Sequence, residues 1–163
     1  MDKVKKVLDR LIEWVCVLLR GLMTILVSYQ VILRYFFNSP NAYTEALAKY
    51  MFVWMVMYGS AYVFGLREHM NIGFIRDRMP EKVRVMLEMV GEMIIVLFAM
   101  GVMIYGGYKQ VSDQMIQLEA ALQIPMGIIY SAVPISSCFI LFYFLYNEMN
   151  LIKQWKNIDE KRR

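Results

Sequence analysis

The chain has 163 residues, of which 59% are hydrophobic and 20% are charged, and its net charge is +4. This apolar share exceeds that of ordinary soluble domains and indicates a protein that lies in lipid. With two cysteines that form no CxxC pair and a single histidine, the chain lacks the residues for a disulfide framework, a thiol relay or a bis-histidine haem.

The first element predicted along the chain is an amphipathic helix over residues 3–14. Its apolar residues, among them Val4, Val7 and Leu11, recur at the spacing of one helix face, and its polar face is basic. A basic amphipathic helix suits an anionic membrane surface. We therefore expect residues 3–14 to lie on the membrane.

Four longer apolar stretches follow, at about residues 15–37, 50–66, 89–108 and 126–146. Each is close to the about 20 residues that a helix needs to cross a bilayer. Between the third and the fourth, residues 110–123 predict a second interfacial helix. The sequence thus predicts an all-α membrane protein with a single domain, residues 1–163, built from four transmembrane helices and amphipathic interfacial helices.

Lysine and arginine are distributed unevenly over the two sides that four spans create. Both termini and the connection between the second and third spans are rich in them, whereas the other two connections carry only Lys49 and Lys109. Basic flanks tend to stay in the cytoplasm. Both termini are therefore expected to be cytoplasmic.

Two ionisable residues are placed inside predicted spans, where charge is costly. Arg20 in the first span and Glu92 in the third lie at similar depth, so they would either pair or extend separately to the interface. His69, the single histidine, follows the second span. Its expected role is a hydrogen bond to the backbone or a contact with a partner subunit.

Further polar candidates gather near the opposite end of the first span. Gln30 and Arg34 stand one helical turn apart, and Glu45 in the next connection is within reach of Arg34. Glu45 also precedes Lys49 by four residues, the spacing of a helical ion pair. We interpret these residues as structural contacts or as contacts with a partner subunit.

Catalytic, metal and cofactor sites are not predicted. The sequence offers no Walker loop, no His/Cys ligand cluster and no Ser/His/Asp set, so an enzyme is not expected. The middle portions of the second to fourth spans carry no ionised residue, whereas carriers often hold their substrate near the bilayer midplane. The chain is therefore interpreted as the companion of a larger protein.

Residues 42–72 resemble the small membrane subunit, the Q or DctQ-type subunit, of tripartite ATP-independent periplasmic (TRAP) transporters. The family pattern is an aromatic residue and an acidic residue opening a span, then a glycine, and a histidine after several more residues. Here these positions are Tyr43, Glu45, Gly59 and His69. The family often has Trp at the first position and a second acidic residue where Ala46 stands.

A second stretch, residues 122–136, is similar to the family's sequence before its last span. The matching positions are Leu122, Pro125, Tyr130 and Pro134. Together the two stretches extend the resemblance over nearly the whole chain, including the four spans.

The resemblance implies a three-part importer in the bacterial inner membrane. A periplasmic protein captures an organic acid of the sialic acid or C4-dicarboxylate type, a large multispan subunit moves it with bound sodium ions, and the small subunit is a scaffold. Its partners are then those two proteins and membrane lipids, with no nucleic acid and no cofactor of its own. The candidates for contact with the periplasmic protein are Glu45, Lys49, Asp113 and Glu119.

Two other classes remain as alternatives. A stand-alone four-span carrier of the multidrug type would need an acidic residue deep in the first span, which offers Arg20 and Arg34 instead. A membrane redox enzyme would need more cysteines or histidines than this chain has. The sequence identifies neither the solute nor the stoichiometry of the complex.

Overall fold

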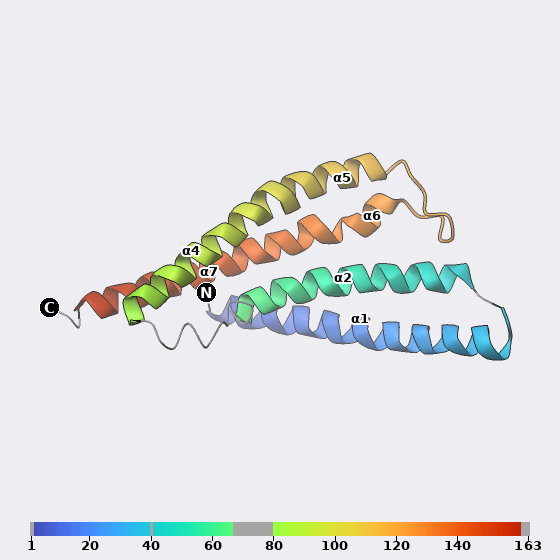
Figure 1. The fold of residues 1–163 in the computed structure, drawn as a ribbon, viewed down its shortest axis with the longest axis horizontal. Coiled ribbons are helices and arrows are strands. Elements are labelled where there is room, and N and C mark those ends of the chain that lie inside the picture. Colours follow the sequence, from blue (N-terminus) through green and yellow to red (C-terminus); the bar gives the residue numbers. More distant parts are fainter. Residues whose placement is uncertain (1, 40, 67–79, 161–163) are drawn as a thin grey trace.

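The computed structural model describes residues 2–39, 41–66 and 80–160, and this part of the chain is all helical, as predicted (Figure 1). In chain order the helices are α1 (Asp2–Phe36), α2 (Ala42–Leu66), α4 (Glu81–Phe98), the π-helix η1 (Ala99–Gly106), α5 (Gly107–Gln114), α6 (Met126–Tyr130) and α7 (Ala132–Glu160). They form two long hairpins. In one, α1 returns as α2; in the other, the continuous rod α4–η1–α5 returns as α6 and α7.

Three helical stretches are long and apolar enough to cross a membrane: Lys3–Phe36, Lys82–Gln114 and Met126–Lys156. The second predicted span, residues 50–66, corresponds to α2, which is not among them although it has 25 residues. Its composition is less apolar, because Lys49, Tyr50, Tyr58 and Tyr62 lower the hydropathy of this helix.

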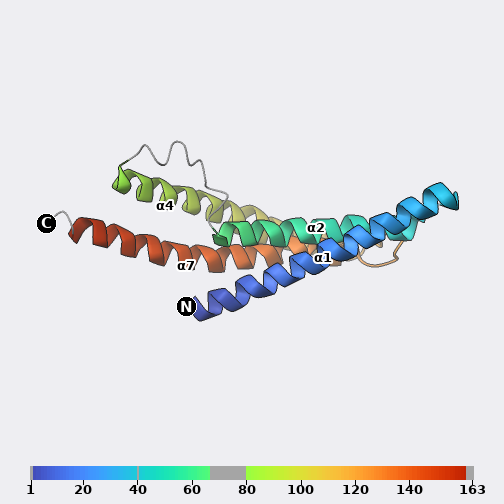
Figure 2. The ribbon, with the colours of Figure 1, turned by 90° about the horizontal axis from the view of Figure 1, so that it is seen from below.

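The segment 3–14 is helical, but it does not form a separate interfacial helix. It continues without a break into the first span, so that α1 is one helix of 35 residues. Residues 3–14 contain no glycine or proline to interrupt the helix, and Ile12 within them is only 1% exposed. Packing against the bundle therefore holds this segment on the axis of α1, which crosses the other helices obliquely (Figure 2).

The helix predicted over 110–123 is also wrong in its second half. α5 ends at Gln114, and the chain then makes a compact turn in which the Glu119 N–H donates to the Ile124 carbonyl at 2.9 Å. The Glu119 carboxylate accepts the backbone N–H groups of Ala121 and Leu122, at 2.7 and 2.6 Å. These side-chain bonds offer the backbone an alternative to helical bonds, which the apolar spacing does not reveal.

The last helix of the chain is divided where the sequence places a proline. Pro134 has no N–H to donate to the carbonyl of Tyr130, and α6 ends at Tyr130 before α7 begins at Ala132. The Ser137 hydroxyl donates to the Ala99 carbonyl at 3.0 Å and so joins α7 to the start of η1.

The core is small and is centred on α7. It consists of Ile12, Ala61, Phe64, Val96, Ala99, Ile140 and Tyr143. Within an 18-residue apolar segment of each stretch, 33% of the residues are buried in Met126–Lys156, but only 6% in Lys3–Phe36. α7 is thus the central helix of the bundle, and α1 lies at its edge.

Candidate functional site

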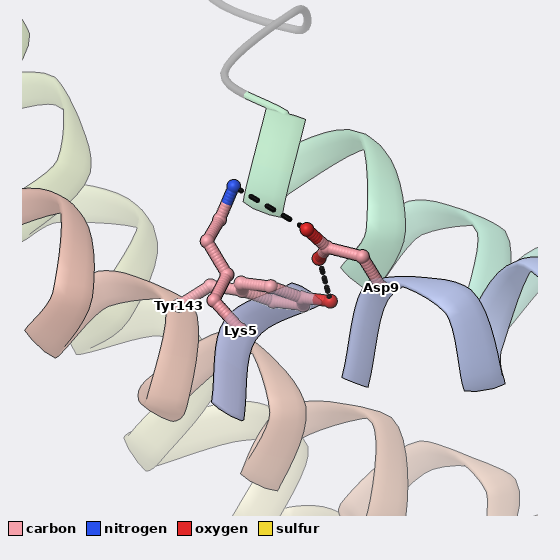
Figure 3. Close-up of polar contacts among 3 residues, drawn as sticks. All are labelled: Lys5, Asp9 and Tyr143. Carbon is pink, nitrogen blue, oxygen red and sulfur yellow. Dashed lines mark hydrogen bonds and ion pairs between the residues drawn. The ribbon is translucent and has the colours of Figure 1, made fainter. Parts of the chain in front are cut away.

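Two polar clusters lie at opposite ends of α1, and each contains an ion pair between side chains. We name the first the N-terminal junction and define it by Lys5, Asp9, Gly65 and Tyr143. In it the Tyr143 hydroxyl donates to Asp9 Oδ1 at 2.6 Å, while Lys5 Nζ lies 3.5 Å from Asp9 Oδ2 (Figure 3). The bond to Tyr143 connects residues 134 positions apart in sequence and fixes α1 to α7.

Gly65 brings a third helix into the junction. A Cβ atom on Gly65 would lie 2.6 Å from Cε1 of the Tyr143 ring, so the backbone of α2 rests directly on this ring. Lys5 Nζ also lies 5.3 Å from the centre of the Tyr146 ring, a cation–π distance. Three helices therefore meet around one buried tyrosine.

Sequence reasoning did not predict the junction. Its only sequence signals are the spacing of Lys5 and Asp9, four residues apart, and the small residues Ala61 and Gly65, also four apart. Neither signal points to Tyr143, because such spacings recur by chance and the contact is remote in sequence.

The second cluster is the α1–α2 groove, a hollow of about 640 Å³ where the two helices approach their connecting turn. Its polar lining includes Gln30, Arg34, Asn41 and Glu45. The structure thus brings together three predicted candidates, Gln30, Arg34 and Glu45. Glu45 forms its ion pair with Lys49, at 2.7 Å.

The charges of the groove are arranged around Glu45. The hydrogen bond and charge of Lys49, with a smaller contribution from Arg34, hold the pKa of Glu45 below its ordinary value. Glu45 and Lys49 are both well exposed, so this pair is a surface feature. The Nε2 atom of Gln30 is enclosed by protein and has no hydrogen-bond partner among the described residues.

The structure does not bring Arg20 and Glu92 together. Arg20 is exposed on α1, whereas Glu92 on α4 is 1% exposed, and no ion pair joins these two described residues. His69 lies outside the described residues.

The residues of the family pattern on α2 have different surroundings. Tyr43 is 52% exposed, and its N–H is held by Asn41 Oδ1 at 3.0 Å. A Cβ atom on Gly59 would meet nothing within 4 Å. These two positions therefore have no packing role that this chain alone explains.

The candidates on the second stretch lie at helix ends or in a helix contact. Pro125 precedes α6, Tyr130 ends it, and Pro134 packs so closely on α5 that a Cβ atom on Gly107 would lie 3.1 Å from its ring. Glu119 is bound within its own turn, whereas Asp113 is exposed. Of these two acidic candidates, Asp113 is the more accessible.

No metal-binding group was found in the part of the chain that the structure describes, where no three His, Cys, Asp or Glu residues are suitably placed. The contacts of the two polar clusters join α1 to α7 at one end and form a surface ion pair on α2 at the other.

Comparison with known proteins decides the family. Residues 23–154 match the model of the family described as "Tripartite ATP-independent periplasmic transporters, DctQ component". The chain belongs to this family. The resemblance to the small TRAP membrane subunit is thereby confirmed, and the chain is a membrane subunit of a TRAP transporter.

Similar proteins agree with the DctQ assignment. The chain is 31% identical to a putative TRAP transporter small permease protein of Haemophilus influenzae, over 98% of this chain and 94% of that protein. It is 28% identical to the sialic acid TRAP transporter small permease protein SiaQ of Vibrio cholerae, over 94% and 88% of the two chains. A 28% identity to the sialic acid TRAP transporter permease protein SiaT of Haemophilus influenzae covers 86% of this chain but 23% of that protein.

Proposed function

We propose that this DctQ-type chain is the scaffold subunit of a sodium-driven importer of organic acids in the bacterial inner membrane. It assembles with a large multispan membrane subunit and works with a periplasmic binding protein. The observation that carries this proposal is the match to SiaT, in which the segment similar to this chain makes up only 23% of the length. A small subunit joined to a much longer permease sequence suggests that the two parts act side by side.

A scaffold role fits the exposed surface of the bundle. Ile25 on α1 and Leu97 on α4 are 68% and 63% exposed, and they belong to long apolar faces. Such faces require lipid or another membrane protein as their surroundings. The α1–α2 groove lies at a helix end, away from the middle of the bundle where a carrier would hold its solute. We therefore assign sodium binding and solute movement to the large subunit, and no catalytic step to this chain.

We further propose four spans with both termini in the cytoplasm. α2 packs along α1 and along α7, so it shares their depth although its hydropathy is lower. Within a bundle its tyrosines face protein as well as lipid: the Tyr58 ring, for example, lies 5.8 Å from the Phe139 ring on α7. The excess of Lys and Arg at both termini gives the orientation.

The names of relatives support a solute class. Two of them are named for sialic acid, a carboxylated sugar, so we propose sialic acid or a similar organic acid, such as a C4-dicarboxylate. The small subunit does not select the solute in this proposal. Selection belongs to the periplasmic protein and the large subunit.

The test is co-purification followed by transport. The tagged chain is extracted from its native membrane in mild detergent, and mass spectrometry identifies the proteins that accompany it. We expect a large TRAP membrane subunit, and we expect the reconstituted pair with its periplasmic protein to accumulate labelled organic acid under an inward sodium gradient. A matched potassium gradient is the control.

Two results would contradict the proposal. One is uptake by the large subunit that is unchanged when this chain is omitted. The other is purification of this chain alone together with solute transport by it in liposomes, which would support the four-span carrier instead.

A further inference from the structure

The N-terminal turns of α1 present one face to the bundle. Asp9 on this face is held by Tyr143 and Lys5 (Figure 3). Ile12 lies on the same face and is buried. An α-helix turns by about 100° per residue, so Lys6 and Arg10, which follow Lys5 and Asp9 directly, lie about 100° around the helix from them. The junction therefore fixes which side chains of α1 point outward.

The outward face is basic. Lys3, Lys6 and Arg10 are exposed, and none of them forms an ion pair with any residue that the structure describes. Among the described side chains of this surface, the carboxylates are those of Asp9, which is already paired with Lys5, and Glu13. The surface around Lys6 and Arg10 thus keeps a net positive charge.

A shallow, open hollow on the surface of α1 accompanies these cations. It measures about 610 Å³ and is lined by Lys6, Val7, Arg10, Leu11 and Trp14, together with Asp9 and Glu13. Val7, Leu11 and Trp14 are 68%, 53% and 66% exposed. Charged and apolar side chains therefore line one hollow, which matches a ligand with an anionic head and hydrocarbon chains.

The position of this hollow along α1 would place it near the lipid headgroups. The 35 residues of α1 extend over about 52 Å, whereas the hydrocarbon core is about 30 Å thick, so part of the helix must project beyond it. With Trp14 at the boundary, Arg10 lies about 6 Å and Lys6 about 12 Å farther along the helix. The polar headgroup layer is about 5–8 Å thick on each side, so Arg10 falls within it and Lys6 falls beyond it, where a long lysine side chain can reach back toward the headgroups.

We propose that Lys6 and Arg10 bind the headgroup phosphate of an anionic phospholipid, with Lys3 beside them and Val7, Leu11 and Trp14 against its chains. A zwitterionic lipid fits less well, because its ammonium or choline group would approach uncompensated cations. The site requires that α1 lies in a membrane, but it does not depend on solute transport or on a partner subunit.

Spin-labelled lipids test the proposal on the full chain. The purified protein is reconstituted in phosphatidylcholine bilayers containing a trace of spin-labelled phosphatidylglycerol or phosphatidylcholine, and electron paramagnetic resonance measures the fraction of label held at the protein. We expect phosphatidylglycerol to be preferred roughly five-fold, the effect of about one basic residue at an anionic surface. Equal fractions of the two lipids would overturn the proposal.

A matched pair of variants separates a defined site from general attraction. Lys6→Gln/Arg10→Gln should reduce the preference to near one. Lys153→Gln/Lys156→Gln removes the same charge from exposed positions near the end of α7 and should leave the preference unchanged. An equal loss in both variants would show diffuse electrostatics and contradict the site, provided that circular dichroism shows both to be folded.

A competition experiment distinguishes a lipid headgroup from a free anion. Millimolar inorganic phosphate at constant ionic strength should not displace spin-labelled phosphatidylglycerol, because it cannot contact Val7, Leu11 and Trp14 as acyl chains do. Displacement by phosphate would replace the lipid site by a simple anion site. None of these measurements involves transport, so their failure and the failure of the scaffold proposal are separate results.

Discussion

The N-terminal junction and the α1–α2 groove contain the same local motif in different surroundings. Each has an acidic and a basic residue four positions apart, Lys5 with Asp9 in one and Glu45 with Lys49 in the other. The side chains of the first pair are 19% and 21% exposed, and those of the second 68% and 63%. At the first pair, α7 contributes Tyr143, which donates to Asp9, and Tyr146, whose ring lies near Lys5, whereas the side chains of the second pair extend into the surroundings of the bundle.

The same sequence spacing therefore contributes differently to stability at the two places. At the junction, the pair belongs to a contact among three helices and is partly removed from solvent, where charge-assisted hydrogen bonds are strong. In the groove, the pair is exposed, and exposed ion pairs contribute little to stability. Substitutions should accordingly have large effects at the junction and small effects in the groove.

The largest effect is expected from Gly65→Ala. The new Cβ atom would lie 2.6 Å from a Tyr143 ring that is fully buried and hydrogen bonded to Asp9, so helices must separate. We expect a loss of about 2–3 kcal/mol in the free energy of unfolding, within the usual range for overpacking. The measurement is unfolding by sodium dodecyl sulfate in mixed micelles, followed by tryptophan fluorescence.

Gly59→Ala is the matched control, since its Cβ atom would meet nothing within 4 Å on the same helix. It should be neutral or slightly stabilising, because alanine favours helix more than glycine does. Equal losses in the two variants would mean that Gly65 matters for helix propensity and not for its contact with Tyr143.

A smaller effect is expected from Tyr143→Phe. This change keeps the ring against Gly65 but removes the hydroxyl that donates to Asp9, at a cost of about 1.5 kcal/mol. A double-mutant cycle with Asp9→Asn, measured by the same unfolding titration, should show coupling between the two positions. Additive losses would contradict the bond, and Tyr105→Phe, at a residue 75% exposed, should change nothing.

The smallest effect is expected from Glu45→Gln. The ionised form of Glu45 is favoured in the folded chain, so its pair contributes stability above the ordinary glutamate pKa of about 4.3, and this contribution is lost as pH falls through the lowered folded value. Because the side chain is exposed, the melting temperatures of Glu45→Gln and the unaltered chain should nearly coincide at pH 7. A clear drop at pH 7 would show that the groove is a structural contact comparable to the junction.

How far the sequence predicts this protein depends on the range of the interactions concerned. Apolar stretches and family motifs identify an all-helical membrane subunit of a TRAP transporter, because hydropathy is a property of consecutive residues. The helix predicted over 110–123 fails at Gln114 because the side chain of Glu119 binds two backbone N–H groups, a local effect that apolar periodicity does not contain.

The polar contacts follow the same division. Glu45 and Lys49 are predicted from their spacing, and their ion pair is present. Tyr143, one of the two partners of Asp9, is 134 residues away, and the pairing of Arg20 with Glu92 does not occur in the structure, because both depend on which faces of separate helices meet. Contacts between helices depend on packing, which the spacing of residues in the sequence does not show.

The π-helix within the second hairpin has a consequence for comparing relatives. Over Ala99–Gly106 the chain uses more residues per turn than an α-helix does, so the faces of α5 are shifted in phase relative to those of α4. This phase shift presents Gly107, which has no side chain, to the ring of Pro134. A one-residue gap in an alignment within Ala99–Gly106 therefore corresponds to a rotation of α5 about its axis relative to α4. Residues before and after the π-helix should accordingly be compared in separate helical registers.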